Sequence, residues 1–387
     1  MVRRPVSALV RGLDHDYAAA VTISVGALVG LLWSGLASAS YHRAFSAWPS
    51  ALAVLGITSW RDFIGSGLMT VFFFTVGLEV ARERHHGSLH DLRHALAPML
   101  AALAGMAGPA VVLVGIGLAT RNHALVRGWG IPMATDIAFT LAALAVAGTS
   151  LPRSLRTFLL TLAITDDVAS IVILAATGAT RVRLSGLAAT GVILIVIASV
   201  SRFHRSTPWR VVALAALWWG LAYAGIEPPL AGVLAALAVP YEAHRSIHLE
   251  SFVTRLSVAL VLPLFAAAYC GLAWSHLGGS APLTIIAAVV AARLVGKTAG
   301  IALGVRGARR LGARFAADIT GEMLTAAGLL CAIGLTVPLL FAGALFLPDG
   351  EVYGAFDLGL LVASVLAAVV GVVLLRSASR HNTEGAA

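Results

Sequence analysis

Two adjacent carboxylates, Asp166 and Asp167, stand in the middle of an otherwise apolar run at residues 161–174. An ionisable side chain at the centre of a lipid bilayer costs about 2.5–3.5 kcal/mol on insertion scales, so two in succession indicate a function. Carboxylates this close repel each other when both are ionised, and the pair therefore titrates as one coupled system. Such a pair binds protons or a small hard cation such as Na⁺ or Li⁺. The alternative is a structural ion pair, or a core helix of a soluble protein.

Three further ionisable side chains fall inside apolar segments, namely Asp136, Arg293 and Lys297. Lys297 is the only lysine in the chain, and a lysine, unlike an arginine, loses its proton when it is desolvated. It is either a titrating group or a fixed counter-ion to a buried aspartate. Both interpretations place it in the same site as the acidic pair.

Hydroxyl side chains at Thr135, Thr165 and Thr336 supply further oxygen ligands near the same depth. If a cation and protons compete for the same carboxylates, binding of one excludes the other. Exchange then follows from alternating access without a separate coupling device. The residues therefore predict a site that binds a cation or protons in turn.

The composition limits which class of protein can carry this site. The chain has 387 residues, of which 59% are hydrophobic and 12% charged, whereas soluble proteins have about 25% charged residues. We therefore expect an all-α polytopic membrane protein. The net charge of +9 lies mainly in short loops, where it is a topology signal, and implies no nucleic-acid partner. The two cysteines form neither a disulfide framework nor a CxxC metal pattern.

With about 20 apolar residues for each crossing, the chain accommodates about twelve transmembrane helices. We place them near residues 17–38, 62–82, 95–119, 127–148, 154–177, 184–201, 210–224, 228–241, 256–274, 281–305, 321–346 and 353–375. The first is read as an uncleaved helix because it is too long for a signal peptide. Most arginines then fall on one side of the membrane, which predicts that both termini are cytoplasmic.

Helix breakers stand at the centres of the fourth and eleventh of these spans. Pro132 occupies the first, and Gly334 and Pro338 occupy the second. Proline removes a backbone donor and glycine lowers helix propensity, so both spans are expected to be interrupted, the alternative being two kinked helices. These spans are the middle members of spans 3–5 and 10–12, a layout typical of an inverted repeat with a binding site at the membrane midplane. An aspartate offsets the positive end of a half-helix there, and a lysine the negative end.

Several stretches taken together resemble the NhaA-type Na⁺/H⁺ antiporters. They are residues 71–80 (VFFFTVGLEV), 130–139 (GIPMATDIAF), 162–167 (LAITDD), 262–266 (LPLFA) and 296–297 (GK). The resemblance implies a twelve-helix fold in which the interrupted fourth and eleventh spans cross. It also implies electrogenic exchange, no cofactor, and a homodimer whose contact includes strands from the loop after the first span. Residues 48–60 show only a weak strand pattern.

Carried over by motif, the resemblance implies that Asp166 and Asp167 bind the cation and protons. Thr135 and Asp136 are then their partners on the interrupted span, and Lys297 is the partner of one of the pair. Candidate modulators are Glu79, Glu83, Glu250, Arg293 and Thr336. Glu79 and Glu83 precede several histidines, and this segment is interpreted either as a pH sensor or as a solvated loop.

The chain departs from the better-known members of that family at several positions. Thr165 stands where an apolar residue is usual, Tyr269 where an asparagine is usual, and Thr298 where a proline is usual. Arg293 replaces an apolar residue one turn before Lys297, where a permanent cation would compete for the aspartates. Around the pH-regulating region, Glu227 replaces a histidine, as do Ser251 and Thr254.

The sequence thus predicts one transporter domain over residues 1–387, with a core near 95–177 and 281–375 and an interface panel near 17–82 and 228–274. We expect exchange of Na⁺ or Li⁺ for H⁺ across the cytoplasmic membrane, with membrane lipid and a second copy of the chain as partners. The alternative is an organic-anion symporter in which Arg293 binds the anion. A membrane enzyme is disfavoured because the chain has no DDxxD spacing and no paired GxGD motif. An ion sensor without transport is the remaining option.

Overall fold

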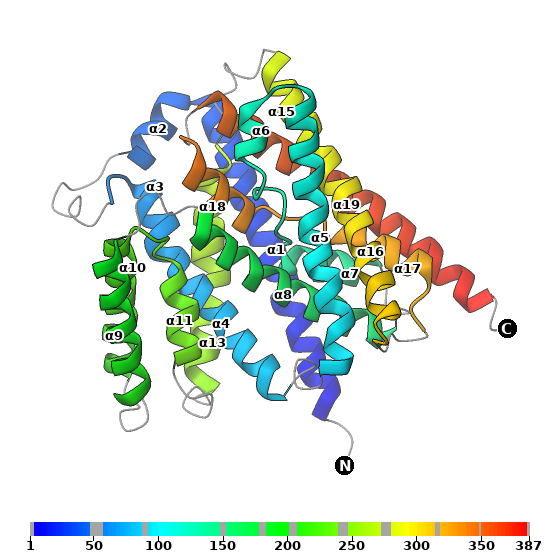
Figure 1. Ribbon diagram of the computed structural model, residues 1–387, viewed down its shortest axis with the longest axis horizontal. Coiled ribbons are helices and arrows are strands. Elements are labelled where there is room, and N and C mark those ends of the chain that lie inside the picture. Colours follow the sequence, from blue (N-terminus) through cyan, green and yellow to red (C-terminus); the bar gives the residue numbers. More distant parts are fainter. Residues whose placement is uncertain are drawn as a thin grey trace. The chain divides into compact units, whose positions relative to one another are not determined.

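The computed structural model describes residues 4–46, 57–86, 92–147, 152–177, 183–200, 207–238, 247–271, 280–313, 318–347 and 350–384. Within these ranges the chain consists of helices joined by turns and irregular segments, without any strand (Figure 1). Most of the weak strand pattern expected at residues 48–60 lies outside the described residues.

The helices divide into two compact units, each built from separate stretches of the chain. Unit 1 comprises Met1–Val21, Asp91–Ser170 and Leu272–Ala387, and unit 2 comprises Thr22–His90 and Ile171–Gly271. Two helices, α1 (Arg4–Leu36) and α8 (Arg153–Thr177), contribute residues to both units. The division into core and panel expected from the sequence stays a prediction.

Unit 1 holds the segments in which the buried ionisable residues were expected. Its other helices are α5 (Leu92–Ala119), α6 (His123–Arg127), α7 (Ile137–Ala147), α15 (Ser280–Ala291), the π-helix η6 (Ala292–Lys297), α16 (Thr298–Arg310), α17 (Gly321–Leu330), α18 (Thr336–Leu345) and α19 (Glu351–Glu384). The segments α15, η6 and α16 follow one another without a break, so the wider π turn lies inside one long helical stretch.

Unit 2 contains the remaining helices. They are α2 (Ser38–Ser46), α3 (Trp60–Asp62), η2 (Phe63–Leu68), α4 (Met69–His86), α9 (Leu184–Val200), α10 (Thr207–Ala224), α11 (Leu230–Ala238), α13 (Ile247–Leu256), η4 (Ser257–Val261) and α14 (Leu262–Tyr269).

Seven helical stretches of the described chain are long and apolar enough to cross a membrane. They are Ala18–Leu36, Trp60–Arg82, Leu96–Ala119, Ser154–Leu174, Ser251–Tyr269, Pro282–Arg310 and Glu351–Ala378. Shorter apolar helices cover Leu184–Val200 and Thr336–Leu345. These lengths are those of a multi-pass membrane protein. The count of twelve spans and the inverted repeat stay predictions.

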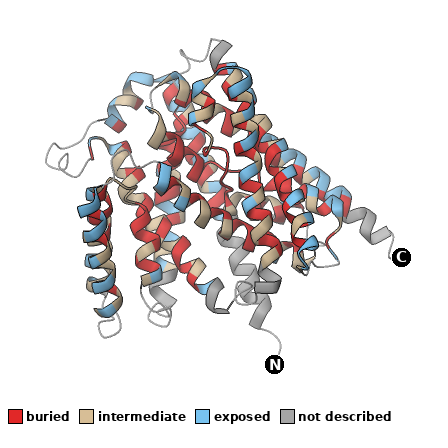
Figure 2. Cartoon of the chain, in the orientation of Figure 1, coloured by how far each residue is buried: buried red, intermediate tan, exposed pale blue. Residues whose placement is uncertain are grey.

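One face of α19 carries large apolar side chains that are exposed. Val365, Val369 and Val373 recur at one-turn spacing and are 56–62% exposed, whereas Ala363 and Ala367 are fully buried. Figure 2 shows that the helix as a whole has both exposed and buried positions. Large apolar side chains outside and small ones inside are the reverse of a soluble helix, because lipid is as apolar as the side chains and close packing selects small residues.

Small residues also bring α5 and the α15–α16 stretch together. A Cβ atom added at Gly108 of α5 would lie 2.0 Å from the carbonyl oxygen of Gly296, and one added at Gly300 would lie 2.2 Å from the carbonyl oxygen of Ala104. The two backbones therefore touch where both positions lack a side chain. This contact fixes η6, and with it Arg293 and Lys297, against the 28-residue helix α5.

Candidate functional site

Two helical segments of unit 1 are interrupted at the positions where breakers were expected. Between α6 and α7, residues 128–136 form turns and irregular backbone, and between α17 and α18 the same holds for residues 331–335. Pro132 lies in the first break and Gly334 in the second. Pro338, by contrast, is in the first turn of α18, where a missing N–H leaves no helical bond unmade. We refer to residues 128–136 as the first break and residues 331–335 as the second break.

The two breaks lie side by side and are joined by hydrogen bonds. The N–H of Asp136 donates to the carbonyl of Ile333 at 2.9 Å. The Thr135 hydroxyl donates to the carbonyl of Cys331 at 2.9 Å, and the Thr140 hydroxyl donates to that of Leu330 at 3.2 Å. Carbonyls at the end of α17 that lack a helical partner are thus satisfied by the first break and the start of α7.

Asp136 binds the start of α18. Its Oδ2 atom accepts from the N–H groups of Leu335 and Thr336, at 3.4 and 3.2 Å, and from the Thr336 hydroxyl at 3.1 Å. The first N–H groups of a helix have no partner within it and carry partial positive charge, so a carboxylate is favoured there. The geometry brings Asp136 and Thr336 together at the start of α18.

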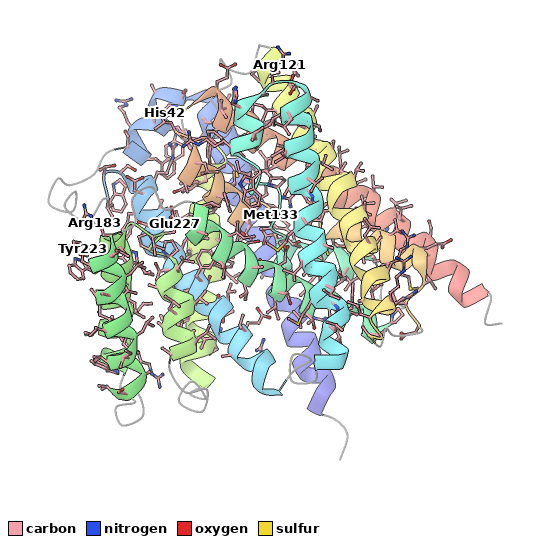
Figure 3. The ribbon with its side chains drawn as sticks, in the orientation of Figure 1. His42, Arg121, Met133, Arg183, Tyr223 and Glu227 are labelled. Atoms are coloured by element: carbon pink, nitrogen blue, oxygen red, sulfur yellow. The ribbon has the colours of Figure 1, made fainter. Side chains whose placement is uncertain are left out.

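Lys297 and Asp166 form a buried ion pair beside the first break. The Lys297 Nζ atom lies 2.9 Å from Asp166 Oδ2, and both side chains are 1% exposed. Nζ also donates to the carbonyl of Met133, labelled in Figure 3. The same Oδ2 atom accepts from the N–H of Thr135 at 2.8 Å. One carboxylate oxygen therefore joins α8, η6 and the first break.

The second aspartate of the doublet, Asp167, is also buried, with 5% of its surface exposed. Successive helical residues point about 100° apart, so Asp167 projects in a different direction from Asp166. The Oδ1 atom of Asp166 is buried and has no hydrogen-bond partner among the described residues. The carboxylate thus keeps one oxygen available for a cation.

Ser170 was not singled out in the sequence. It follows Asp166 by one helical turn, is 2% exposed, and its hydroxyl has no hydrogen-bond partner within the described part of the chain. Residues four apart on a helix are neighbours, so the spacing from Asp166 could have indicated that Ser170 lies beside it.

Arg293 is fully buried, and its hydrogen bonds go to the main chain of both breaks. Nε donates to the carbonyl of Ala332 at 2.7 Å. Nη2 donates to that of Ala134 at 3.0 Å, and Nη1 to that of Pro132 at 3.4 Å. The sequence led us to expect this arginine near the aspartates, but gave no indication that carbonyls would bind it.

Among the other expected modulators, Glu79 belongs to unit 2 and the side chains of two others are not described. Glu79 is 3.5 Å from Arg82 on the same helix, a partly exposed pair of the kind that contributes little to stability. The side chains of Glu83 and Glu250 lie outside the described residues. The Thr165 hydroxyl donates to the carbonyl of Thr161, so its hydrogen serves its own helix.

Unit 2 has a polar cluster of its own that the sequence did not reveal. Arg61 is 8% exposed, and its Nε atom donates to the carbonyl of Ala268 at 3.0 Å. The Tyr269 hydroxyl donates to the carbonyl of Arg61 at 3.4 Å. Glu227, labelled in Figure 3, lies between α10 and α11, and burial raises the pKa of its carboxyl to about 7.

Comparison with known proteins gives consistent matches over nearly the whole chain. Residues 11–375 match the family described as Na+/H+ antiporter 1. The chain is 36% identical over 369 residues to Na(+)/H(+) antiporter NhaA 2 of Novosphingobium aromaticivorans, with 93% of each chain covered. It is 37% identical over 386 residues to the Na(+)/H(+) antiporter NhaA of Acidovorax sp., covering 94% of this chain and 91% of the relative. It is 35% identical over 399 residues to Na(+)/H(+) antiporter NhaA 1 of Erythrobacter litoralis, covering 99% and 97%.

Proposed function

Because this chain belongs to the Na⁺/H⁺ antiporter 1 family, we propose that it is a secondary transporter that exchanges Na⁺ for H⁺ across a membrane. Its seven long apolar helices suit a multi-pass membrane protein. The observation that carries the site assignment is the buried Asp166 carboxylate, held by Lys297 at 2.9 Å beside two interrupted helices. Such breaks at membrane depth are tolerated where they line a binding site.

In the proposed cycle, Na⁺ and protons compete for the Asp166 and Asp167 carboxylates. Na⁺ approaches the open Oδ1 atom of Asp166, and Lys297 gives up Oδ2, because a buried carboxylate does not hold two cations at once. Protons restore the first state when the site faces the opposite side. A site that binds either ion, but not both, exchanges them by alternating access alone.

Lys297 is the group that makes the exchange electrogenic. If Lys297 releases its proton when Na⁺ binds and Asp167 releases a second, and both groups take up protons again when Na⁺ leaves, then two protons are exchanged for each Na⁺. Lysine suits this role because its ammonium loses a proton readily when desolvated. Asp136 and Thr336 remain at the start of α18 throughout, where they keep the half-helix N–H groups bound.

Several finer features complete the proposal. Li⁺ is carried as well as Na⁺, since oxygen ligands suit both hard ions. The protein resides in the bacterial inner membrane with both termini in the cytoplasm, as the distribution of arginines favours. It works without a cofactor, among membrane lipids, as a homodimer.

The organic-anion symporter is not supported. That alternative needed Arg293 to bind the substrate, but its guanidinium donates to three main-chain carbonyls. The matched relatives are named as antiporters.

Exchange is tested with the purified protein in liposomes that hold an imposed pH gradient. Addition of Na⁺ or Li⁺ is expected to dissipate the gradient, and Asp166→Asn or Asp167→Asn is expected to lower that rate about 100-fold or more, because a neutral amide binds neither ion as a carboxylate does. Asp318→Asn, which changes an exposed carboxylate, serves as the matched control and should keep the rate. Wild-type protein that gives no response to either ion at neutral or alkaline pH would refute the function.

A further inference from the structure

Arg293 is the largest fully buried side chain of the described residues, and it sits where the two breaks meet. A buried guanidinium requires acceptors for its donors, because the cost of removing an unpaired charge from water is severe. Here the acceptors are the carbonyls of Pro132 and Ala134 in the first break and that of Ala332 in the second break. The arginine therefore ties the two breaks to η6 and to each other.

The charge on Arg293 suits this position. Ala332 follows the end of α17, where the free carbonyls of a helix carry partial negative charge. A guanidinium remains protonated in proteins and presents its donors as a rigid fork. It is therefore a permanent counter-charge for these carbonyls at every stage of a transport cycle.

Gly334 provides the space that the guanidinium occupies. A Cβ atom added there would lie 2.4 Å from Arg293 Nη2 and 2.7 Å from the Ala134 carbonyl oxygen. Any side chain at position 334 would force apart the groups that bond across the breaks. The guanidinium of Arg293 therefore fits at this place only because position 334 is a glycine.

Lys297, one turn further along the same helix, has a different set of partners. It bonds one carbonyl of the first break, that of Met133, and shares its ammonium with Asp166. Of the three consecutive carbonyls of Pro132, Met133 and Ala134, the arginine binds the outer two and the lysine the middle one. The lysine can leave its carbonyl while the arginine keeps the other two in place.

We propose that Arg293 is a positioning residue for ion exchange: it holds the two breaks together as a fixed cation, which frees Lys297 to leave Asp166 and Met133 when Na⁺ binds. The inference rests on the proposed Na⁺/H⁺ exchange and adds a division of labour between two cations. Without Arg293, Lys297 is the one remaining cation among the described residues that bonds the carbonyls of the first break. Na⁺ then has to displace Lys297 from Asp166 while Lys297 also holds the first break in place.

The test measures Na⁺-dependent dissipation of a pH gradient in liposomes, with kcat and the KM for Na⁺ obtained separately. For Arg293→Met, kcat is expected to fall roughly 10- to 100-fold, the scale at which a misplacement of about 1 Å costs rate. The KM for Na⁺ should rise about tenfold, because Lys297 is then held more firmly against displacement. Arg293→Lys should recover part of both losses, since an ammonium keeps the charge and three donors.

Two matched controls separate positioning from general damage. Arg306→Met removes an exposed arginine of α16 and should leave kcat and KM unchanged. Gly334→Ala keeps Arg293 but displaces its fork, and should reproduce the rise in KM. Gly307→Ala, where an added Cβ meets nothing within 4 Å, should not.

A merely structural role for Arg293 predicts a smaller active fraction, hence a lower apparent kcat with an unchanged KM. That result, or wild-type kinetics in Arg293→Met, would overturn the inference. If Arg293→Met fails to fold, Arg293→Lys and Gly334→Ala decide the question by the same KM criterion. A wild type without any Na⁺-dependent exchange would instead refute the proposed function, so the two failures are distinguishable.

Discussion

At the scale of single residues, the main feature of the candidate site is that the two carboxylate oxygens of Asp166 have different surroundings. Oδ2 is bound by Lys297 and by the N–H of Thr135, whereas Oδ1 has no partner among the described residues. Breaking a buried ion pair from one side costs about 3–5 kcal/mol because a charge is left uncompensated. In the proposed cycle, a cation that approaches Oδ1 supplies the compensation that the departing lysine removes.

Glu227 gives a prediction for pH and stability. It lies outside the apolar spans, and burial raises the pKa of its carboxyl from 4.5 to about 7 in the folded protein. The folded state therefore keeps its proton between these values while the unfolded state has lost it, so stability falls as pH rises from about 4.5 to 7. The ionised, buried form is unfavourable at all higher pH.

We therefore expect Glu227→Gln to raise the Tm at pH values above 7, by about 2–4 °C for each kcal/mol relieved. Below pH 4.5 the substitution should have almost no effect, since the carboxyl is then protonated in both states. Thermal unfolding in detergent across this pH range measures the difference. Glu351→Gln, at an exposed glutamate of α19, is the control, and an equal rise at acidic and alkaline pH would contradict the explanation.

At the scale of helices, the contact between α5 and the α15–α16 stretch supports the site from outside. Gly108→Ala is expected to destabilise the protein because the new methyl group would meet the Gly296 carbonyl oxygen at 2.0 Å. Overpacking of this kind costs about 1–3 kcal/mol and should lower the Tm. Gly115→Ala on the same helix meets nothing within 4 Å and is the matched control. Equal Tm values for the two variants would show that the helices are not held by this contact.

The sequence predicted much of this arrangement because membranes restrict which residues are tolerated. Buried charges at Asp136, Asp166 and Lys297 stood out by their cost, and Pro132 and Gly334 marked the two breaks. The role of Pro338 was less clear, because a proline is compatible with the first turn of a helix as well as with its interruption.

The partners of Arg293 could not be predicted for a physical reason. Its acceptors are main-chain carbonyls, which every residue has. The direction of these carbonyls depends on the backbone conformation of the two breaks. Its own direction depends on the π turn η6, which alters the register of the helix locally. Residue types alone therefore placed the arginine near the site without indicating what it binds.

At the scale of the whole molecule, the proposed exchange moves charge across the membrane. When two protons enter for each Na⁺ that leaves, one net positive charge moves inward, and a potential acts on it with about 2.3 kcal/mol per 100 mV. An inside-negative potential set with K⁺ and valinomycin should therefore accelerate Na⁺ efflux from liposomes. Uptake of H⁺ and efflux of ²²Na⁺ are measured together. Equal rates at inside-negative and zero potential would argue for electroneutral exchange, while an uncoupled leak would appear in protein-free liposomes as well.

The main-chain N–H of Thr135 and the ammonium of Lys297 both donate to the same carboxylate oxygen, Asp166 Oδ2. A cation or proton bound to this carboxylate would weaken both hydrogen bonds together, so the main chain responds directly to whether the site is occupied. Ion binding at Oδ1 and main-chain contact at Oδ2 thus meet in a single carboxylate group, and no relay through distant side chains is needed for occupancy to reach the main chain.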